Sequence, residues 1–227
     1  VLVAVTVVVV IVTTNAVNWI DGLDGLAAGI VAIAAGTFFV YSYILSRGFD
    51  PPNVFSVSTF TTAALVGCCL GFLPHNFHPA HLFMGDSGAL TLGLLLSAAT
   101  ISMTGNVDPS QVGTGSEVNA ALVPIIMPLA ILTLPLLDMV LAVVRRTRAG
   151  KMPWHPDSKH LHHQMLRFGH GHRRAVLILY GWAALVGCAS LAFAFLDGWI
   201  PWAAVGAGTV AVTVLTLWLP ARLPEPS

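Results

Sequence analysis

The chain has 227 residues, of which 56% are hydrophobic and 9% charged, with ten basic residues balanced by ten acidic ones. Soluble domains carry about 25% charged residues, so this composition excludes a water-soluble globular protein. The balanced charge gives no reason to expect a nucleic-acid partner. Apolar stretches of about 20 residues span a bilayer, and several such stretches predict an integral membrane protein.

Seven apolar segments follow one another along the chain. Each is expected to be a helix, because a backbone in lipid must satisfy its own hydrogen bonds. The segments are Val1–Thr14, Leu26–Leu45, Val57–Leu73, Ser87–Met103, Ala121–Val144, Ala175–Leu196 and Pro201–Leu219. The first is too short to span and does not begin with Met, so we expect it to be truncated. The predicted fold is an all-α, polytopic transmembrane helical bundle that forms a single domain over residues 1–227.

The charges distribute unevenly when these segments alternate across the bilayer. One side receives nine of the ten basic residues and all nine histidines, whereas the other receives only Arg47. The loops on the basic side are 15–25, 74–86, 145–174 and 220–227. Because Lys and Arg accumulate in cytoplasmic loops, we expect this side to be cytoplasmic. Asp21, Asp24 and Asp86 lie on the same side.

The first polar stretch, Asn15–Gly25, holds two Asn, two Asp and two Gly among eleven residues. It can form a simple turn, since Asn, Asp and Gly favour turns. Alternatively, Asn18, Asp21 and Asp24 can present their side-chain oxygens to a ligand or a cation. The residues alone leave both interpretations open.

The second polar stretch, Phe83–Gly88, precedes an apolar segment. Asp86 can simply cap the helix, but a cap needs no flanking glycine such as Gly85, which lets a ligand approach the backbone. A helix N-terminus favours phosphate, which Asp86 would repel unless a divalent cation lay between them. Magnesium binds carboxylate and amide oxygens and bridges to phosphates. Asp86 and Asn18 are therefore the predicted half-site for Mg²⁺.

The third polar stretch lies in the basic loop 145–174. Lys159, His160, His162 and His163 have no Cys or nearby Glu that would complete a zinc site. They can be solvated surface residues or donors to a diphosphate within a positive potential. Histidine can also act as an acid or base near neutral pH.

Asp138 is expected about two turns inside a helix that ends at arginines. A carboxylate costs roughly 2.5–3.5 kcal/mol at mid-bilayer on insertion scales, and less near the interface. We interpret Asp138 as the ion-pair partner of Arg145 or Arg146. The alternative is that Asp138 lines the functional site.

Together, and in this order, the three stretches resemble the polyprenyl-phosphate N-acetylhexosamine-1-phosphate transferases, glycosyltransferase family 4. The matching motifs are Asn15-Ala-Val-Asn18 with Asp21-Gly-Leu-Asp24-Gly25, Phe83-Met-Gly-Asp86-Ser-Gly88 and His160-Leu-His162-His163. The histidine motif resembles the GlcNAc-1-phosphate branch, and its surroundings resemble actinobacterial members that use decaprenyl phosphate. The resemblance covers the whole chain but only the later part of the family fold. The family's early Asp-Asp motif has no match here, so we expect it upstream and expect residues 1–227 alone to be inactive.

This resemblance implies transfer of GlcNAc-1-phosphate, or a related N-acetylhexosamine-1-phosphate, from a UDP-sugar to decaprenyl or undecaprenyl phosphate. UMP would leave, and cell-envelope polysaccharide synthesis would begin at the cytoplasmic face of the plasma membrane. The implied cofactor is Mg²⁺, with Mn²⁺ as an alternative, held by Asp86 and Asn18. A homodimer is one expected assembly, and no nucleic acid is expected.

The resemblance also assigns roles to individual residues. Phe83 would stack on uracil and Asp24 would contact its edge. Catalysis is assigned to Asp86, His160, His162 and His163. Substrate binding is assigned to Asn18, Asp21, Asp24, Phe83, Gly85 and Lys159.

Three rival functions are weaker matches. The phospho-MurNAc-pentapeptide transferases usually carry three consecutive histidines followed by an aromatic residue and Glu, whereas Gln164 and Met165 follow here. A transporter or channel would use Asp138 and the histidines as a proton or metal path, but the polar groups gather on one face. A CDP-alcohol phosphotransferase needs an Ala-Arg pair after its first Asp-Gly and two later Asp residues, which this chain lacks.

Overall fold

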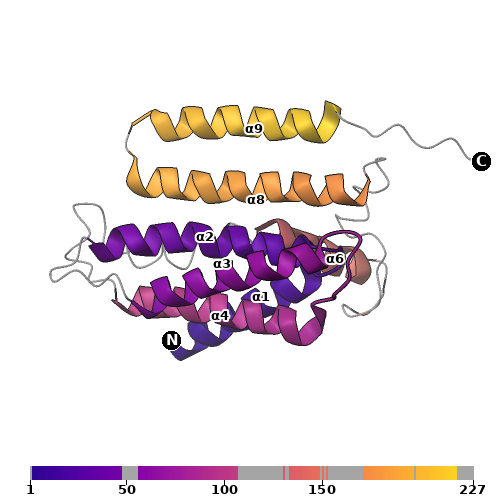
Figure 1. The fold of residues 1–227 in the computed structure, drawn as a ribbon, viewed down its shortest axis with the longest axis horizontal. Coiled ribbons are helices and arrows are strands. Elements are labelled where there is room, and N and C mark those ends of the chain that lie inside the picture. Colours follow the sequence, from indigo (N-terminus) through magenta and orange to yellow (C-terminus); the bar gives the residue numbers. More distant parts are fainter. Residues whose placement is uncertain are drawn as a thin grey trace, which may run out of the picture.

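The computed structural model describes residues 2–47, 56–106, 133–148, 171–196 and 198–218, with the single residues 130, 150 and 152. All regular structure in these ranges is helical, which confirms the predicted all-α bundle (Figure 1). The helices are α1 (Leu2–Ile20), α2 (Leu26–Arg47), α3 (Val57–Asn76), α4 (Gly85–Asn106), α6 (Thr133–Arg148), α8 (His172–Phe195) and α9 (Ile200–Trp218). Six of them are long and apolar enough to cross a membrane. The protein is therefore a multi-pass membrane protein.

The first helix corrects one expectation. α1 continues through Asn15 to Ile20, and residues Val3–Ile20 are long enough to span, so the first apolar segment is not too short. Polar side chains are accommodated because they bond to the preceding turn. Thr14 Oγ1 donates to the Val10 carbonyl at 2.7 Å, and Asn15 Nδ2 donates to the Ile11 carbonyl at 2.8 Å. The connecting loop is thereby shortened to residues 21–25.

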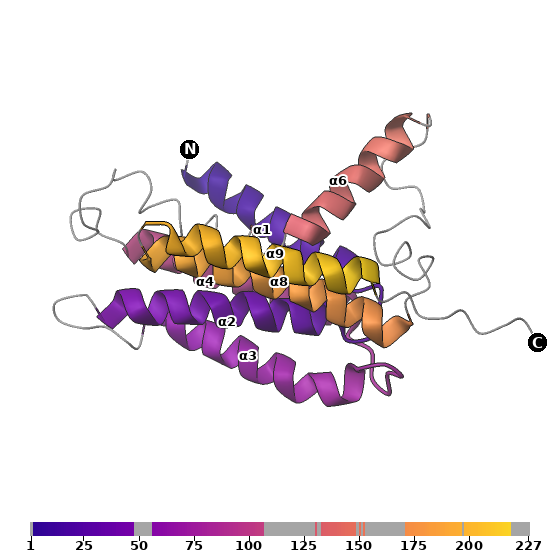
Figure 2. The ribbon, with the colours of Figure 1, turned by 90° about the horizontal axis from the view of Figure 1, so that it is seen from above.

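Helix α2 lies in the middle of the bundle, with α3 on one side and α8 on another, while α1 packs against α4 (Figures 1 and 2). Ala27, Ala34 and Ala35 on α2 are fully buried. Small side chains allow membrane helices to approach closely. At Gly29 the two helices are so close that an added Cβ would overlap the Tyr180 ring of α8.

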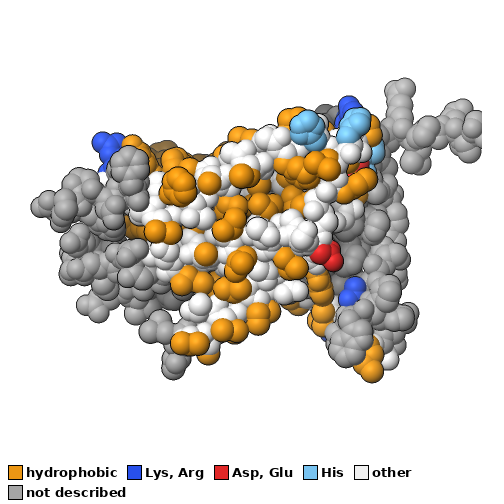
Figure 3. Space-filling model, turned by 60° about the horizontal axis from the view of Figure 1, so that its bottom comes forward, with side chains coloured by type: hydrophobic (Ala, Val, Ile, Leu, Met, Phe, Trp, Pro, Cys, Tyr) orange, Lys and Arg blue, Asp and Glu red, His pale blue; other side chains and the backbone are white. Residues whose placement is uncertain are grey.

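Helix α9 packs against α8 and leaves most of its apolar surface exposed. Trp202 is 71% exposed and Leu217 is 72% exposed. On the face shown in Figure 3, hydrophobic side chains cover the middle, whereas acidic and histidine side chains gather near one end. This distribution suits an apolar belt in lipid with a polar site at one end.

The described helix ends follow the predicted alternation. The loop 21–25, the segment between α3 and α4 and the start of α8 lie at one end of the bundle, on the right in Figure 1. Arg47 and the connection from α8 to α9 lie at the other end. The expected loop 145–174 is helical at both of its margins, because α6 ends at Arg148 and α8 begins at His172.

Candidate functional site

A cavity of about 290 Å³ opens at the polar end of the bundle. It lies between the loop that joins α1 to α2 and the chain that enters α4. Its lining residues are Asp21, Gly22, Leu23, Asp24, Asn76, Phe83, Met84, Gly85 and Asp86. Two stretches about 60 residues apart in the sequence thus form one polar cavity.

Asn18 and Asp86 connect α1 to α4 beside this cavity. Asn18 Nδ2 donates to Asp86 Oδ1 at 3.0 Å. Helix α4 begins at Gly85, which has a φ of +67° that favours glycine. Asp86 therefore lies inside the first helical turn and contacts another helix, so the simple N-cap interpretation does not describe it.

Asp21 is close enough to Asp86 for the two charges to interact. Burial, and then repulsion from the Asp86 charge, raise the pKa of Asp21 above its usual value. Two mutually repelling carboxylates beside an amide are relieved by a divalent cation, which favours their charged forms. The donor set of Asn18, Asp21 and Asp86 consists of oxygens of the kind that Mg²⁺ prefers. These residues fit the expected cation.

Asp24 has a different environment within the same cavity. Burial alone would raise the pKa of Asp24, but hydrogen bonds outweigh it and lower the pKa below its usual value. Oδ2 of Asp24 pairs with His78 Nδ1 at 2.8 Å and accepts the Ala80 backbone N–H at 3.2 Å. An ionised carboxylate can only accept, so His78 Nδ1 donates.

His172, the first residue of α8, joins the same cluster. Its Nε2 accepts the backbone N–H of Asp24 at 3.1 Å. Its ring stacks on that of His78 with centroids 4.1 Å apart and an interplanar angle of 12°. Ligand atoms of Asp24, His78 and His172 lie within 4.8 Å of one another, so the three could hold a metal. However, the two histidine rings are nearly parallel, so the lone pairs of their nitrogens lie in separate planes. One ring would have to rotate before both could bind the same metal ion.

Neighbouring helices hold the loop in place. Asn76, which is buried at the end of α3, accepts the Gly25 N–H at 3.0 Å and donates to the Leu82 carbonyl at 2.9 Å. The Tyr180 hydroxyl of α8 donates to the Gly25 carbonyl. These contacts fix the loop against both α3 and α8.

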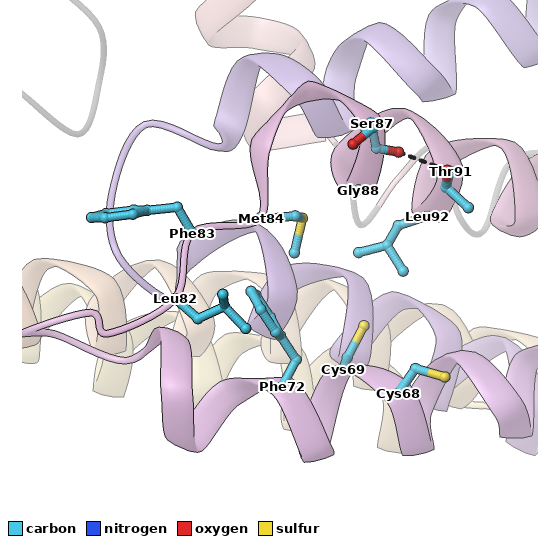
Figure 4. A pocket seen from close by; sticks show the side chains of 10 residues that line it. All are labelled: Cys68, Cys69, Phe72, Leu82, Phe83, Met84, Ser87, Gly88, Thr91 and Leu92. Carbon is cyan, nitrogen blue, oxygen red and sulfur yellow. Dashed lines mark hydrogen bonds between the residues drawn. The ribbon is translucent and has the colours of Figure 1, made fainter.

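An apolar groove of about 480 Å³ adjoins the polar cavity and shares Phe83 and Met84 with it. Its floor comes from α3 and from the first turns of α4 (Figure 4). The Phe83 ring extends away from the other labelled side chains in this view and is 74% exposed. This residue is therefore available to a ligand and is not part of the core.

Comparison with known proteins finds similarity to one family. Residues 1–104 match the model described as glycosyl transferase family 4. The chain is also 44% identical, over 209 residues, to the decaprenyl-phosphate N-acetylglucosaminephosphotransferase of Mycolicibacterium smegmatis. That alignment covers 89% of this chain and 50% of the relative. The chain is therefore similar to glycosyl transferase family 4 over residues 1–104 and to this transferase over most of its length.

Other relatives are also similar over much of the chain. A probable undecaprenyl-phosphate N-acetylglucosaminyl 1-phosphate transferase of Bacillus subtilis is 37% identical over 77% of this chain and 43% of its own length. A phospho-N-acetylmuramoyl-pentapeptide-transferase of Moorella thermoacetica is 34% identical over 79% of this chain and 48% of its own length. This chain spans about half the length of the curated relatives it matches.

The structure brings together six of the ten predicted site residues. These are Asn18, Asp21, Asp24, Phe83, Gly85 and Asp86. Lys159, His160, His162 and His163 lie outside the described residues, as do the side chains of Asp138 and Arg145. Arg146 is among the described residues. Its guanidinium lies 5.9 Å from the centre of the Trp19 ring, and Trp19 directly follows Asn18 in the sequence.

Sequence reasoning missed three contributors, namely Asn76, His78 and His172. A signal was present in the run from His75 to His81, which holds three histidines and an asparagine on the predicted cytoplasmic side. Nothing in that run indicates which side chain would reach Asp24. The pairing depends on how α3, α8 and the first loop pack.

Proposed function

We propose that the protein transfers GlcNAc-1-phosphate, or a related N-acetylhexosamine-1-phosphate, from a UDP-sugar to a polyprenyl phosphate. Decaprenyl phosphate is the acceptor suggested by the name of the Mycolicibacterium relative, and undecaprenyl phosphate by that of the Bacillus relative. The observation that carries the proposal is the contact between Asn18 and Asp86 beside a cavity that also holds Asp21, Asp24 and Phe83. This arrangement supports binding of a nucleotide diphosphate through a cation.

In the proposed reaction, an oxygen of the polyprenyl phosphate attacks the β-phosphorus of the UDP-sugar. The bond from that phosphorus to the bridging oxygen breaks, and UMP leaves with the electron pair. Phosphoryl transfer depends mainly on positioning and electrostatic stabilisation. A bound Mg²⁺ or Mn²⁺ would neutralise charge on the diphosphate. Asn18 and Asp86 would hold this cation, with Asp21 beside them.

Other residues of the chain would bind the rest of the donor. Phe83 has an exposed ring for stacking on uracil, and Asp24 lines the same cavity. The basic stretch with Lys159, His160, His162 and His163 precedes α8 in sequence, and α8 begins in contact with Asp24. This order supports a role for those residues at the phosphates or the sugar.

We place the site on the cytoplasmic face of the plasma membrane. Nine of the ten basic residues fall in segments on the side of the cavity by sequence alternation, which follows the positive-inside pattern. A UDP-sugar would be supplied on that side.

A second candidate is transfer of phospho-MurNAc-pentapeptide. One observation favours it: the phospho-N-acetylmuramoyl-pentapeptide-transferase of Desulforudis audaxviator is 48% identical, although over only 43% of this chain. The two candidates share the nucleotide and the lipid and differ in the sugar.

The deciding experiment measures the lipid product. The intact protein in membranes is supplied with polyprenyl phosphate and, separately, with UDP-GlcNAc, UDP-GalNAc and UDP-MurNAc-pentapeptide. We expect UMP release and a GlcNAc-diphosphate lipid by mass spectrometry with the first donor. A product only with the peptide donor would select the second candidate, and no UMP from any donor would reject both.

Asp86→Asn tests the cation half-site. We expect transfer to fall by at least about 100-fold, because loss of a ligand should exceed the 10–100-fold losses typical of groups that only orient ligands. Leu90→Ala, one turn further along α4 and 41% exposed, is the control and should retain activity. Both variants should insert and unfold at the wild-type temperature. Full activity in Asp86→Asn would contradict the half-site.

A further inference from the structure

The clearest unexplained feature of the site is the way in which the Asp24 carboxylate is held. In the described part of the chain, both hydrogen bonds to this carboxylate reach Oδ2, one from His78 and one from the Ala80 backbone. The other oxygen, Oδ1, is left for a ligand in the cavity that Asp24 lines. The carboxylate therefore presents one acceptor atom in a fixed orientation.

His78 is itself held from two directions. Its ring stacks on His172, and its backbone carbonyl accepts a hydrogen bond from Arg173 Nε at 2.7 Å. His172 accepts the Asp24 N–H with Nε2, so its own ring proton is on Nδ1 when it is neutral. The loop, the α3–α4 segment and the start of α8 thus fix the His78 donor relative to Asp24.

A fixed acceptor distinguishes nucleobases in a way that a mobile one does not. Uracil presents an N–H at ring position 3, whereas cytosine presents a bare nitrogen there and an amine beside it. An ionised carboxylate aimed at position 3 binds the first and repels the second. A carboxylate that is free to turn can instead accept from the cytosine amine.

We propose that His78 is a positioning residue that makes Asp24 selective for uracil over cytosine nucleotides. This inference rests on the proposed function, since it assumes that the cavity holds the nucleobase of a nucleoside diphosphate. In this proposal His78 acts through Asp24, to which its Nδ1 donates, and takes no part at the reacting phosphates. Its side chain is 40% exposed, so replacing it leaves the buried core intact.

Two substitutions separate the donor from the ring. In His78→Asn, the amide nitrogen can occupy the position of Nδ1, so the bond to Asp24 is kept while the stack on His172 is lost. In His78→Phe, the stack is kept while the donor is lost. If the ring has only a structural role, His78→Phe should preserve binding better than His78→Asn. If His78 positions Asp24, His78→Asn should preserve binding better than His78→Phe.

The first readout is equilibrium binding of UDP and CDP to the purified intact protein. We expect His78→Phe to weaken UDP binding about tenfold and to reduce the UDP-to-CDP preference by a similar factor, a loss within the range for a hydrogen bond to a charged group. In His78→Asn, the affinity for UDP and the UDP-to-CDP preference should both stay within about threefold of wild type. Asp24→Asn should also lose the preference, because an amide can donate as well as accept.

The second readout is transfer kinetics. Because the base is remote from the breaking bond, His78→Phe should raise KM for the UDP-sugar with kcat within about twofold. If no transfer occurs with any donor, the proposed function fails, while the binding arm still tests His78. The inference is overturned if His78→Phe keeps the wild-type UDP-to-CDP preference, or if His78→Asn loses as much as His78→Phe.

Discussion

Three carboxylates share one cavity, yet their surroundings differ at the scale of single atoms. The pKa of Asp21 is raised by burial and by Asp86. Burial also acts to raise the pKa of Asp24, but hydrogen bonds from His78 and Ala80 and the nearby histidine charges together lower it. Shifts in opposite directions within one site indicate different tasks. Asp21 and Asp86 are suited to sharing a cation, and Asp24 is suited to accepting a hydrogen bond from a ligand.

Phe83→Leu tests the exposed aromatic ring. We expect KM for the UDP-sugar to rise about 5- to 160-fold, since stacking on an aromatic side chain contributes about 1–3 kcal/mol per base, while kcat changes little. Because Phe83 is 74% exposed, its loss should leave the thermal unfolding temperature unchanged. Lower stability at unchanged KM would instead assign Phe83 to packing.

The sequence allowed part of this site to be predicted, for reasons visible in individual residues. Asn18 and Asp86 lie in short polar stretches that flank apolar helices, and that placement alone indicates a site. His78 and His172 could not be assigned, because they meet Asp24 across 54 and 148 residues. Such distant contacts depend on helix packing, which no local pattern encodes.

At the scale of helices, apolar runs predicted where elements lie but not where they end. α1 extends six residues beyond the expected Thr14, to Ile20, because Thr14 and Asn15 bond to their own helix. α3 extends to Asn76 despite Pro74. In both cases polar or helix-breaking residues continue a helix that the apolar pattern would have stopped. A hydropathy pattern indicates which residues suit a lipid environment, whereas the ends of a helix depend on hydrogen bonds.

Gly29→Ala tests the contact between α2 and α8. A Cβ at this position would overlap the Tyr180 ring, and overpacking costs about 1–3 kcal/mol. We expect a lower unfolding temperature in detergent and weaker nucleotide binding, because Tyr180 also holds the Gly25 carbonyl.

Gly36→Ala, on the same helix, is the matched control. Its nearest neighbour would be Val66 at 3.8 Å, an ordinary contact, so helix propensity alone predicts stability that is unchanged or higher by up to about 1 kcal/mol. Equal effects of the two substitutions would show that the close approach of α2 and α8 contributes nothing.

At the scale of the whole molecule, alternation of the helices predicts which parts face the cytoplasm. In a background without Cys68 and Cys188, a cysteine at Ser158 should react with an impermeant thiol reagent only from the cytoplasm. A cysteine at Trp199, which is 76% exposed in the connection from α8 to α9, should react only from outside. The reverse labelling pattern would invert the topology and the proposed site with it.

The dependence of the first loop on α8 has a consequence for the order of events during biosynthesis. Asp24 leaves the ribosome 148 residues before His172, an interval of about 7–30 s at translation rates of about 5–20 residues per second. During that time the loop has neither its His172 nor its Tyr180 partner, whatever the state of α1 and α2. A nascent chain that has not yet reached α8 therefore holds Asp24 without these two anchors, and the orientation of Asp24 becomes fixed only when the later helix has inserted.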